Sequence, residues 1–214
     1  MNPEEIASLR TDYETLGLNR SDLADDPFHQ FERWFDDAVS AGVNQPNAFV
    51  LATASVDGAP SARAVLMKDI SAEGLVFYTN MDSRKGQELA ANPRAAACFV
   101  WLELHRQVRL EGVAQEVDDQ RADAYFLSRP PGARLAAAAS PQSRVVSDRS
   151  ELDRAYAQLE ERYPNGEVPR PPRWGGYVMV PSVFEFWQGR PNRFHDRFRY
   201  RLWEDGWLIE RLAP

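Results

Sequence analysis

The sequence predicts a mainly β protein with flanking helices, an α+β fold built around an antiparallel sheet or barrel. From Ala48 onward the apolar residues fall in short runs of strand length. Most of these runs are separated by turns and not by helices, which favours antiparallel pairing. The 214 residues, 43% hydrophobic and 27% charged, are enough for one sizeable core. We therefore expect one domain over residues 26–214, preceded by an arm over residues 1–25.

Helices are expected before the sheet and between its strands. Residues 4–16 look helical but carry few apolar positions, so we expect this arm to pack on another surface or to act as a lid. A firmer helix begins at the cap Asp26-Pro27 and ends at Gly42. Its predicted core face carries Phe28, Phe31, Trp34, Phe35 and Val39. Further helices are predicted over residues 83–91, 118–127 and 147–163.

The strands are predicted from their apolar runs and the turn residues that flank them. The first two form a hairpin closed by a turn at residues 56–58. The Pro-rich segment 164–172 is predicted to be a loop within the domain. The predicted strands cover residues 49–55, 61–68, 74–79, 95–102, 107–117, 177–180, 183–187 and 198–203, with a last short strand after residues 206–207.

Composition excludes several classes of function. A net charge of −7 and a pI near 5.1 argue against general nucleic-acid binding, which needs a surplus of cations. The apolar runs are too short to cross a membrane, and residues 1–10 lack the apolar core of a signal peptide, so we expect a cytoplasmic protein. A single cysteine, Cys98, and three histidines predict neither a disulfide framework nor a metal site.

The basic residues are unevenly typed. Of 25 Lys and Arg residues only two are lysines, Lys68 and Lys85. A compact ammonium differs physically from a planar guanidinium, so the two lysines favour local anion sites where they stand; chance placement is the alternative.

The first candidate anion site contains Arg63 and Lys68. These residues are five apart, so a regular strand would place them on opposite faces. There they would hold two different anions or simply be solvated.

The second candidate site runs from a strand through a turn into a helix over residues 78–85. Backbone N–H groups and the helix dipole at such a junction favour a phosphate. Ser83, Arg84 and Lys85 would add hydroxyl and cationic donors. The alternative is ordinary capping by Asp82 or Ser83.

Two more candidates lie further along the chain. Tyr125 and Arg129 at a helix end, followed by Gln142 and Ser143, form a possible second anion clamp; a packed tyrosine and an exposed arginine are the alternative. In the fourth candidate, basic residues alternate with others, so a strand would project a row of cations from one face. A solvated, charged edge strand is the alternative, and a lone histidine in such a row can also be structural. The row is Arg193, His195, Arg197 and Arg199.

Ten ordered motifs between about residue 9 and residue 214 resemble the pyridoxine/pyridoxamine 5′-phosphate oxidase family. They include R-x-V-L-x-K at 63–68, S-R-K at 83–85, Y-F-x-S-R-P at 125–130, F-W-Q-G at 186–189 and R-x-H-D-R-F at 193–198. The resemblance implies an FMN-binding split β-barrel that forms a homodimer with FMN between the subunits. It also implies oxidation of pyridoxamine and pyridoxine 5′-phosphate to pyridoxal 5′-phosphate, with O2 reduced to H2O2.

The resemblance also implies roles for individual residues. Lys68, Tyr125 and Arg129 would hold the substrate phosphate. Arg193 and His195 would lie over the substrate ring as catalytic residues, and Arg10 and Tyr13 of the arm would close on it. The FMN contacts would come from Arg63, Lys68, Tyr78, Thr79, Ser83, Arg84, Lys85, Gln107, Gln142, Ser143, Trp187 and Arg197.

One departure from the family pattern keeps alternatives open. The family usually has a phosphate-binding serine a few residues after Arg129, where this chain has Ala133 followed by Arg134. A lost hydroxyl contact is worth about 1 kcal/mol, which weakens substrate binding without abolishing it. The alternatives are a related FMN-dependent oxidase with another substrate, of the phenazine-pathway type, and a non-catalytic FMN or pyridoxal phosphate binding protein. The latter would have no use for Arg193 and His195.

Overall fold

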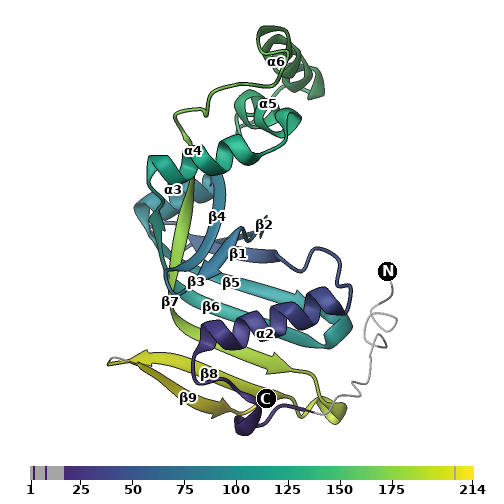
Figure 1. Cartoon of the computed structure of the whole chain (residues 1–214), viewed down its shortest axis with the longest axis vertical. Helices are drawn as coiled ribbons and strands as arrows, with labels where there is room; N and C mark the ends of the chain where they lie inside the picture. The colour runs from purple at the N-terminus through teal and green to yellow at the C-terminus, as the bar shows by residue number, and fades with distance from the viewer. Residues whose placement is uncertain (1, 3–7, 9–16, 205) are drawn as a thin grey trace. The chain divides into compact units, whose positions relative to one another are not determined.

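The computed structural model describes residues 2, 8, 17–204 and 206–214 (Figure 1). They form two compact units. The first comprises Met1–Val50, Ala97–Glu111 and Pro181–Pro214, and the second comprises Leu51–Ala96 and Gly112–Val180. The helix predicted over residues 4–16, and with it Arg10 and Tyr13, lies outside the described residues apart from Ser8.

The strands belong to one nine-stranded sheet with the order β2-β1-β5-β6-β7-β4-β3, while β8 pairs with β7 and with β9. The pairs β3 with β4, β4 with β7, β7 with β8 and β8 with β9 are all antiparallel. The predicted α+β fold with an antiparallel sheet is confirmed. The strands are β1 (Ala48–Ala54), β2 (Pro60–Leu66), β3 (Asp69–Ser71), β4 (Gly74–Asn80), β5 (Arg94–Trp101), β6 (Arg106–Glu116), β7 (Trp174–Gln188), β8 (Asp196–Trp203) and β9 (Gly206–Leu212).

The helices divide between the units. The first unit holds α2 (Pro27–Ser40) and the 3-10 turns η1 (Arg20–Asp22), η2 (Leu102–Leu104) and η3 (Pro191–Arg193). The second unit holds α3 (Arg84–Ala91), α4 (Asp119–Ser128), α5 (Pro131–Ala139) and α6 (Arg149–Arg162), of which α5 and α6 pack against each other. None of the described helices is long and apolar enough to cross a membrane.

Helix α2 begins as predicted. The Asp26 carboxylate accepts hydrogen bonds from the backbone N–H groups of Phe28 and His29 at 2.8 and 3.2 Å, and Pro27 occupies the first turn. Phe31 packs edge-on against Phe99 with 5.0 Å between ring centroids.

The predicted core face of α2 is partly wrong. Phe31 and Trp34 are buried, and Phe28 and Phe35 are half-buried, but Val39 is 53% exposed. Ala38, seven residues after Phe31, is buried in its place. Two full helical turns return to the same face at that spacing, so the small alanine completes the core stripe.

The end of the predicted arm is bonded to the first unit's strands. The backbone N–H of Leu18 donates to Asp196 at 3.0 Å, and Arg211 donates to the Leu18 carbonyl at 3.2 Å. The Tyr200 hydroxyl donates to the Ala24 carbonyl at 2.7 Å. Residues 17–25 are therefore held against β8 and β9.

Strand β7 is continuous where two strands were predicted. Its 15 residues include Pro181, which lies between the two predicted strands. The segment before Pro181 pairs with β4 and the segment after it pairs with β8. Pro181 lies between these two ladders, so neither of them needs its missing N–H.

Elements β3 and α5 are additional to the predicted ones. Strand β3 has three residues, too few for a periodic pattern. Helix α5 has Pro131 in its first turn and four consecutive alanines at its end. Those are ordinary helix signals, but the segment is short and has no apolar stripe to mark it as a helix.

Helix α3 leaves no room for a side chain at Gly86. A Cβ there would lie 2.2 Å from the backbone oxygen of Met81. The Ser83 side chain caps the helix at the Gly86 N–H at 3.4 Å, so the helix start is fixed against the turn before it. Glycine is required at this close approach.

Gly86→Ala is expected to lower the free energy of unfolding by about 1–3 kcal/mol, because the backbone must shift to admit the methyl group. The matched control is Gly132→Ala in α5, where the nearest atom to a Cβ is the Tyr156 hydroxyl at 3.4 Å. The control should be neutral or stabilise the chain by up to about 1 kcal/mol. Urea unfolding of both variants measures the difference, and equal effects would contradict the close approach at Gly86.

Candidate functional site

The second unit contains a cavity of about 1050 Å³. It is lined by residues of β2 and β4, the start of α3, the end of α4 and part of α5. The described residues that line it include no Asp or Glu. Five cationic side chains share the lining: Arg63, Lys68, Arg84, Lys85 and Arg129.

Arg63 and Lys68 line this cavity together. The prediction that they would face opposite sides of a strand is wrong, because β2 ends at Leu66. Beyond that point the Lys68 N–H donates to the Val76 carbonyl of β4 at 2.8 Å, and the strand alternation no longer applies.

Lys85 is the most buried of the five cations, with 8% of its surface exposed. Its ammonium donates to the Thr79 hydroxyl and the Gln142 carbonyl, each at 3.0 Å, and to the Ser83 hydroxyl at 3.3 Å. All three acceptors are neutral. Burial, together with the nearby charge of Arg63, lowers the pKa of Lys85 from 10.5 to about 8. A phosphate in the cavity would supply the missing negative charge.

Aromatic rings form another part of the cavity wall. Tyr78 and Tyr125 stack with their ring centroids 3.9 Å apart and 16° between their planes. Trp174 lies parallel to both, at 5.7 Å from Tyr78 and 6.1 Å from Tyr125. Their faces make this wall rigid and apolar.

Two cations lie against these rings. The Lys68 ammonium is 5.8 Å from the Tyr125 centroid, and the Arg129 guanidinium is 5.0 Å from that of Trp174. Burial lowers the pKa of Arg129, and its Nη1 is buried with no hydrogen-bond partner in the part of the chain that is described. A buried donor of this kind is costly unless a ligand accepts from it.

The structure thus gathers most of the predicted residues of the second unit. Ser83 is fully buried and contacts Lys85 without lining the cavity. The other ten line the cavity: Arg63, Lys68, Tyr78, Thr79, Arg84, Lys85, Tyr125, Arg129, Gln142 and Ser143.

The predicted row of four cations on one strand face does not exist. Strand β8 begins at Asp196, so Arg193 and His195 precede it. Arg193 lies in η3 with a φ of 59°. The remaining two arginines have carboxylate partners: Arg197 pairs with Glu185 at 2.9 Å and Arg199 with Glu210 at 2.8 Å. Neither therefore requires an external anion.

His195 is fixed by its neighbours in the first unit. Its Nδ1 accepts the backbone N–H of Arg190 at 3.1 Å, and its ring centroid is 4.6 Å from that of Trp187. Burial and the charge of Arg193 lower the pKa of His195. Because Nδ1 accepts a hydrogen bond, the proton of the neutral imidazole lies on Nε2.

Gln107 and Trp187 line a separate cavity of about 370 Å³ in the first unit, together with His105 and Arg106. Arg106 is held by Gln188 at 2.9 Å and by Asp37 at 2.7 Å. Five predicted residues therefore belong to the first unit: Gln107, Trp187, Arg193, His195 and Arg197.

Two sets of residues in the second unit were missed by sequence reasoning. Trp174 opens β7 in the sequence W-G-G-Y, and its contact with Tyr78 comes from strand pairing, which the sequence does not reveal. The second set is the buried pair Thr53 and Glu88. Glu88 follows Arg84 by four residues on α3, a spacing typical of helical ion pairs and the one available signal.

Comparison with known proteins matches two stretches of the chain to family models. Residues 35–163 match the family model described as pyridoxamine 5′-phosphate oxidase, which covers more than half of the chain. The chain belongs to this family. Residues 174–214 match the pyridoxine 5′-phosphate oxidase C-terminal dimerisation region, which implies a homodimer. The resemblance found in the sequence is confirmed.

Curated relatives of the same family match over nearly the whole chain. The pyridoxine/pyridoxamine 5′-phosphate oxidase of Cupriavidus pinatubonensis is 52% identical over 98% of this chain and 99% of its own length. That of Synechocystis is 48% identical over the full length of both.

Solved structures confirm the split-barrel fold of the family. PhzG from Burkholderia lata, in complex with tetrahydrophenazine-1-carboxylic acid, matches with a TM-score of 0.89 and 31% identity over 95% of this chain and all of its own. A pyridoxamine 5′-phosphate oxidase-related, FMN binding protein from Nostoc punctiforme matches with a TM-score of 0.69 and 16% identity over 90% of this chain and all of its own.

The lowered pKa of Lys85 predicts a pH-dependent stability of the ligand-free chain. Between pH 8 and 10.5 the unfolded chain keeps the Lys85 proton and the folded chain has lost it, so stability rises with pH. The contribution is up to about 1 kcal/mol per pH unit. Urea unfolding from pH 7.5 to 9.5 should show this rise, and Lys85→Met should lack it. Equal slopes in the two proteins would contradict the assignment.

Proposed function

We propose that this chain is an FMN-dependent pyridoxine/pyridoxamine 5′-phosphate oxidase. It oxidises either substrate to pyridoxal 5′-phosphate while O2 is reduced to H2O2; with the amine substrate, water enters and ammonia leaves. The observation that most supports this function is sequence identity. About half of all positions, over almost the whole length, are identical to those of relatives with this name. A cavity lined by five cations and no described carboxylate suits ligands that each bear a phosphate.

The cavity residues fit FMN. When bound, FMN supplies the two-electron chemistry that protein side chains lack. Lys85 fits the FMN phosphate because its ammonium is buried among neutral acceptors. Arg84 and Ser83 stand with it at the start of α3, where backbone N–H groups favour an anion. The remaining proposed FMN contacts are Arg63, Lys68, Tyr78, Thr79, Gln107, Gln142, Ser143, Trp187 and Arg197.

Lys68, Tyr125 and Arg129 are proposed to hold the substrate phosphate. The unpartnered, buried Nη1 of Arg129 supports this role, as does the position of Lys68 over the Tyr125 ring. Binding energy gained at the phosphate, away from the reacting carbon, positions the substrate for oxidation. Ala133 removes one hydroxyl from this clamp and leaves its three main members in place.

Arg193 and His195 are proposed as the catalytic residues over the substrate ring. The bond from the Arg190 N–H to His195 Nδ1 supports this proposal, because it leaves Nε2–H as a donor of fixed direction. Arg10 and Tyr13 are proposed to close on the same substrate.

The proposed function also implies a domain organisation and an assembly for this chain. We propose that residues 26–214 act as one FMN-binding domain, since β5, β6 and β7 each continue from one unit into the other. Residues 1–25 would form an arm and possible lid rooted at Leu18. We also propose that FMN lies at the interface of the homodimer and that the protein is cytoplasmic.

A second candidate is an FMN-dependent oxidase of the phenazine-pathway type. The 31% identity with PhzG and the presence of Ala133 favour it. The higher identity with the vitamin B6 enzymes, and the complete set of Lys68, Tyr125 and Arg129, favour the first function.

The first test is an oxidase assay of the purified, FMN-saturated protein. We expect pyridoxal 5′-phosphate and an equal amount of H2O2 from pyridoxamine 5′-phosphate, from pyridoxine 5′-phosphate or from both. Absence of aldehyde from both substrates would refute the proposal. FMN binding without turnover would instead support a non-catalytic binding protein.

Arg129→Ala tests the substrate-phosphate clamp. Loss of a charge-assisted hydrogen bond should raise KM for the phosphorylated substrate by about 10- to 100-fold. Pyridoxamine without its phosphate serves as the control, since kcat/KM for that substrate should change little. An equal loss on both substrates would show that Arg129 acts elsewhere.

A further inference from the structure

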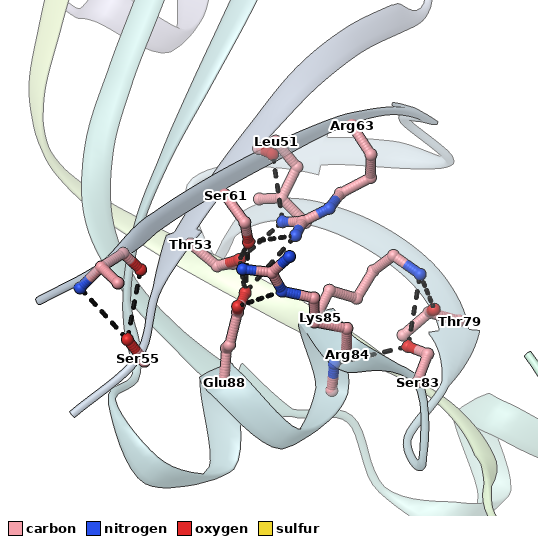
Figure 2. A network of polar contacts seen from close by, with 12 residues as sticks. Leu51, Thr53, Ser55, Ser61, Arg63, Thr79, Ser83, Arg84, Lys85 and Glu88 are labelled. Atoms are coloured by element: carbon pink, nitrogen blue, oxygen red, sulfur yellow. Dashed lines mark hydrogen bonds and ion pairs between the residues drawn. The ribbon is translucent and has the colours of Figure 1, made fainter. Parts of the chain in front are cut away.

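A buried carboxylate pairs with two arginines of the cavity without lining the cavity itself. Glu88 of α3 is 7% exposed and accepts from Arg84 Nε at 2.8 Å. Its other oxygen accepts from the hydroxyls of Thr53 and Ser61, each at 2.5 Å (Figure 2). Burial opposes the charge of Glu88, but the hydrogen bonds from Ser61, Thr53 and Arg84 outweigh it and lower its pKa to about 2. Glu88 is therefore ionised at any physiological pH.

The two hydroxyls connect Glu88 to Arg63. An ionised carboxylate can only accept, so Thr53 and Ser61 both give their protons to it. Their lone pairs are then available to Arg63, whose Nη1 donates to Thr53 and Nη2 to Ser61, each at 2.5 Å. The Leu51 carbonyl accepts a further bond from Nη1 at 3.3 Å, and Glu88 itself lies 3.4 Å from Nη2. The guanidinium is held by both terminal nitrogens.

The bonds that hold Arg63 act against the electrostatic repulsion between Arg63 and Lys85. Arg63 lies close enough to Lys85 for its charge to disfavour the ammonium, and no carboxylate bonds to Lys85 among the described residues. Without its anchors, Arg63 would relieve the repulsion by rotating away on its flexible side chain. The bonds to Thr53, Ser61 and Glu88 hold the two cations near each other before an anion arrives.

We propose that Thr53 and Glu88 are positioning residues for the FMN phosphate, acting through Arg63 and Arg84. Thr53 is 3% exposed, and neither residue lines the cavity, so neither can contact the cofactor directly from these positions. This inference rests on the proposed function, since FMN is the ligand whose phosphate Arg63 and Arg84 would meet.

A role of Glu88 through its negative charge and a role through the positions of the arginines predict opposite effects of its neutralisation on phosphate binding. If Glu88 were only a counter-charge, its neutralisation would leave a more positive cavity and tighten the binding of a phosphate. If Glu88 positions the arginines, its neutralisation releases them and weakens that binding. Removal of the Thr53 hydroxyl changes no charge, so it tests position alone.

The first experiment compares Thr53→Val with Thr53→Ser in the full chain stripped of flavin. Flavin fluorescence titrations give the dissociation constants of FMN and of riboflavin, which lacks the phosphate. We expect Thr53→Val to raise the FMN constant about tenfold, with riboflavin changed less than about twofold. Thr53→Ser keeps the hydroxyl and should bind FMN as the wild type does. Equal weakening of FMN and riboflavin, or none, would overturn the proposal.

The second experiment neutralises Glu88. Glu88→Gln should also raise the FMN dissociation constant about tenfold and spare riboflavin. Asp123→Asn is the matched control, because Asp123 pairs with Arg170 at 2.5 Å in the same unit and does not line the cavity. It makes the same change in net charge and should leave FMN binding unchanged. Equal or tighter binding of FMN by Glu88→Gln would show that Glu88 acts only as a counter-charge. That result would overturn the proposal.

Thermal unfolding of each flavin-free variant identifies a fold defect. A defect would lower the affinity for both flavins together, and that outcome counts against the proposal. A wild-type chain that binds no FMN would refute the proposed function as well. A wild-type chain that binds FMN and oxidises pyridoxamine 5′-phosphate, with variants that bind FMN equally well, would refute the positioning role alone.

Discussion

The cost of holding cations together out of water governs the second unit. Lys85 is buried with neutral acceptors, Arg129 has a buried nitrogen without a partner, and the cavity they line has no carboxylate among its described residues. A chain folds around such a cavity only where surrounding bonds fix each cation. Here the fixing groups are the Ser83 cap, the hydroxyls around Glu88 and the rings of Tyr125 and Trp174. An anion that binds there compensates this charge and stabilises the folded chain.

In the first unit, several arginines are paired with carboxylates. Arg197 is neutralised by Glu185, and Arg106 is held by Asp37 and Gln188. Bonds of this kind fix the geometry of these arginines and cancel their charge. In the second unit, by contrast, Lys85 bonds only to neutral acceptors and Arg129 keeps a buried nitrogen without a partner among the described residues.

Much of the fold could be predicted because its signals are local. The cap at Asp26-Pro27, the hairpin turn after Ala54 and the apolar runs of β4 and β5 each depend on neighbours in sequence. The failures depend on partners distant in sequence. Pro181 does not break β7 because its two halves pair with different strands, and Lys68 joins Arg63 because β2 ends two residues earlier. Most cavity residues of the second unit were already candidates from local patterns of charge and turn, and the family resemblance assigned roles to them and to Tyr78 and Thr79, whereas Thr53 and Glu88 became visible only when β1, β2 and α3 were brought together.

The scarcity of lysine has a chemical consequence beyond the geometry of binding. An aldehyde condenses with a primary amine to form an imine, and a guanidinium resists that reaction. Only two of the 25 basic side chains of this protein are amines, and one of them, Lys85, is engaged by three oxygen acceptors. A chain that releases an aldehyde is thereby built almost entirely from basic groups that its own product does not modify.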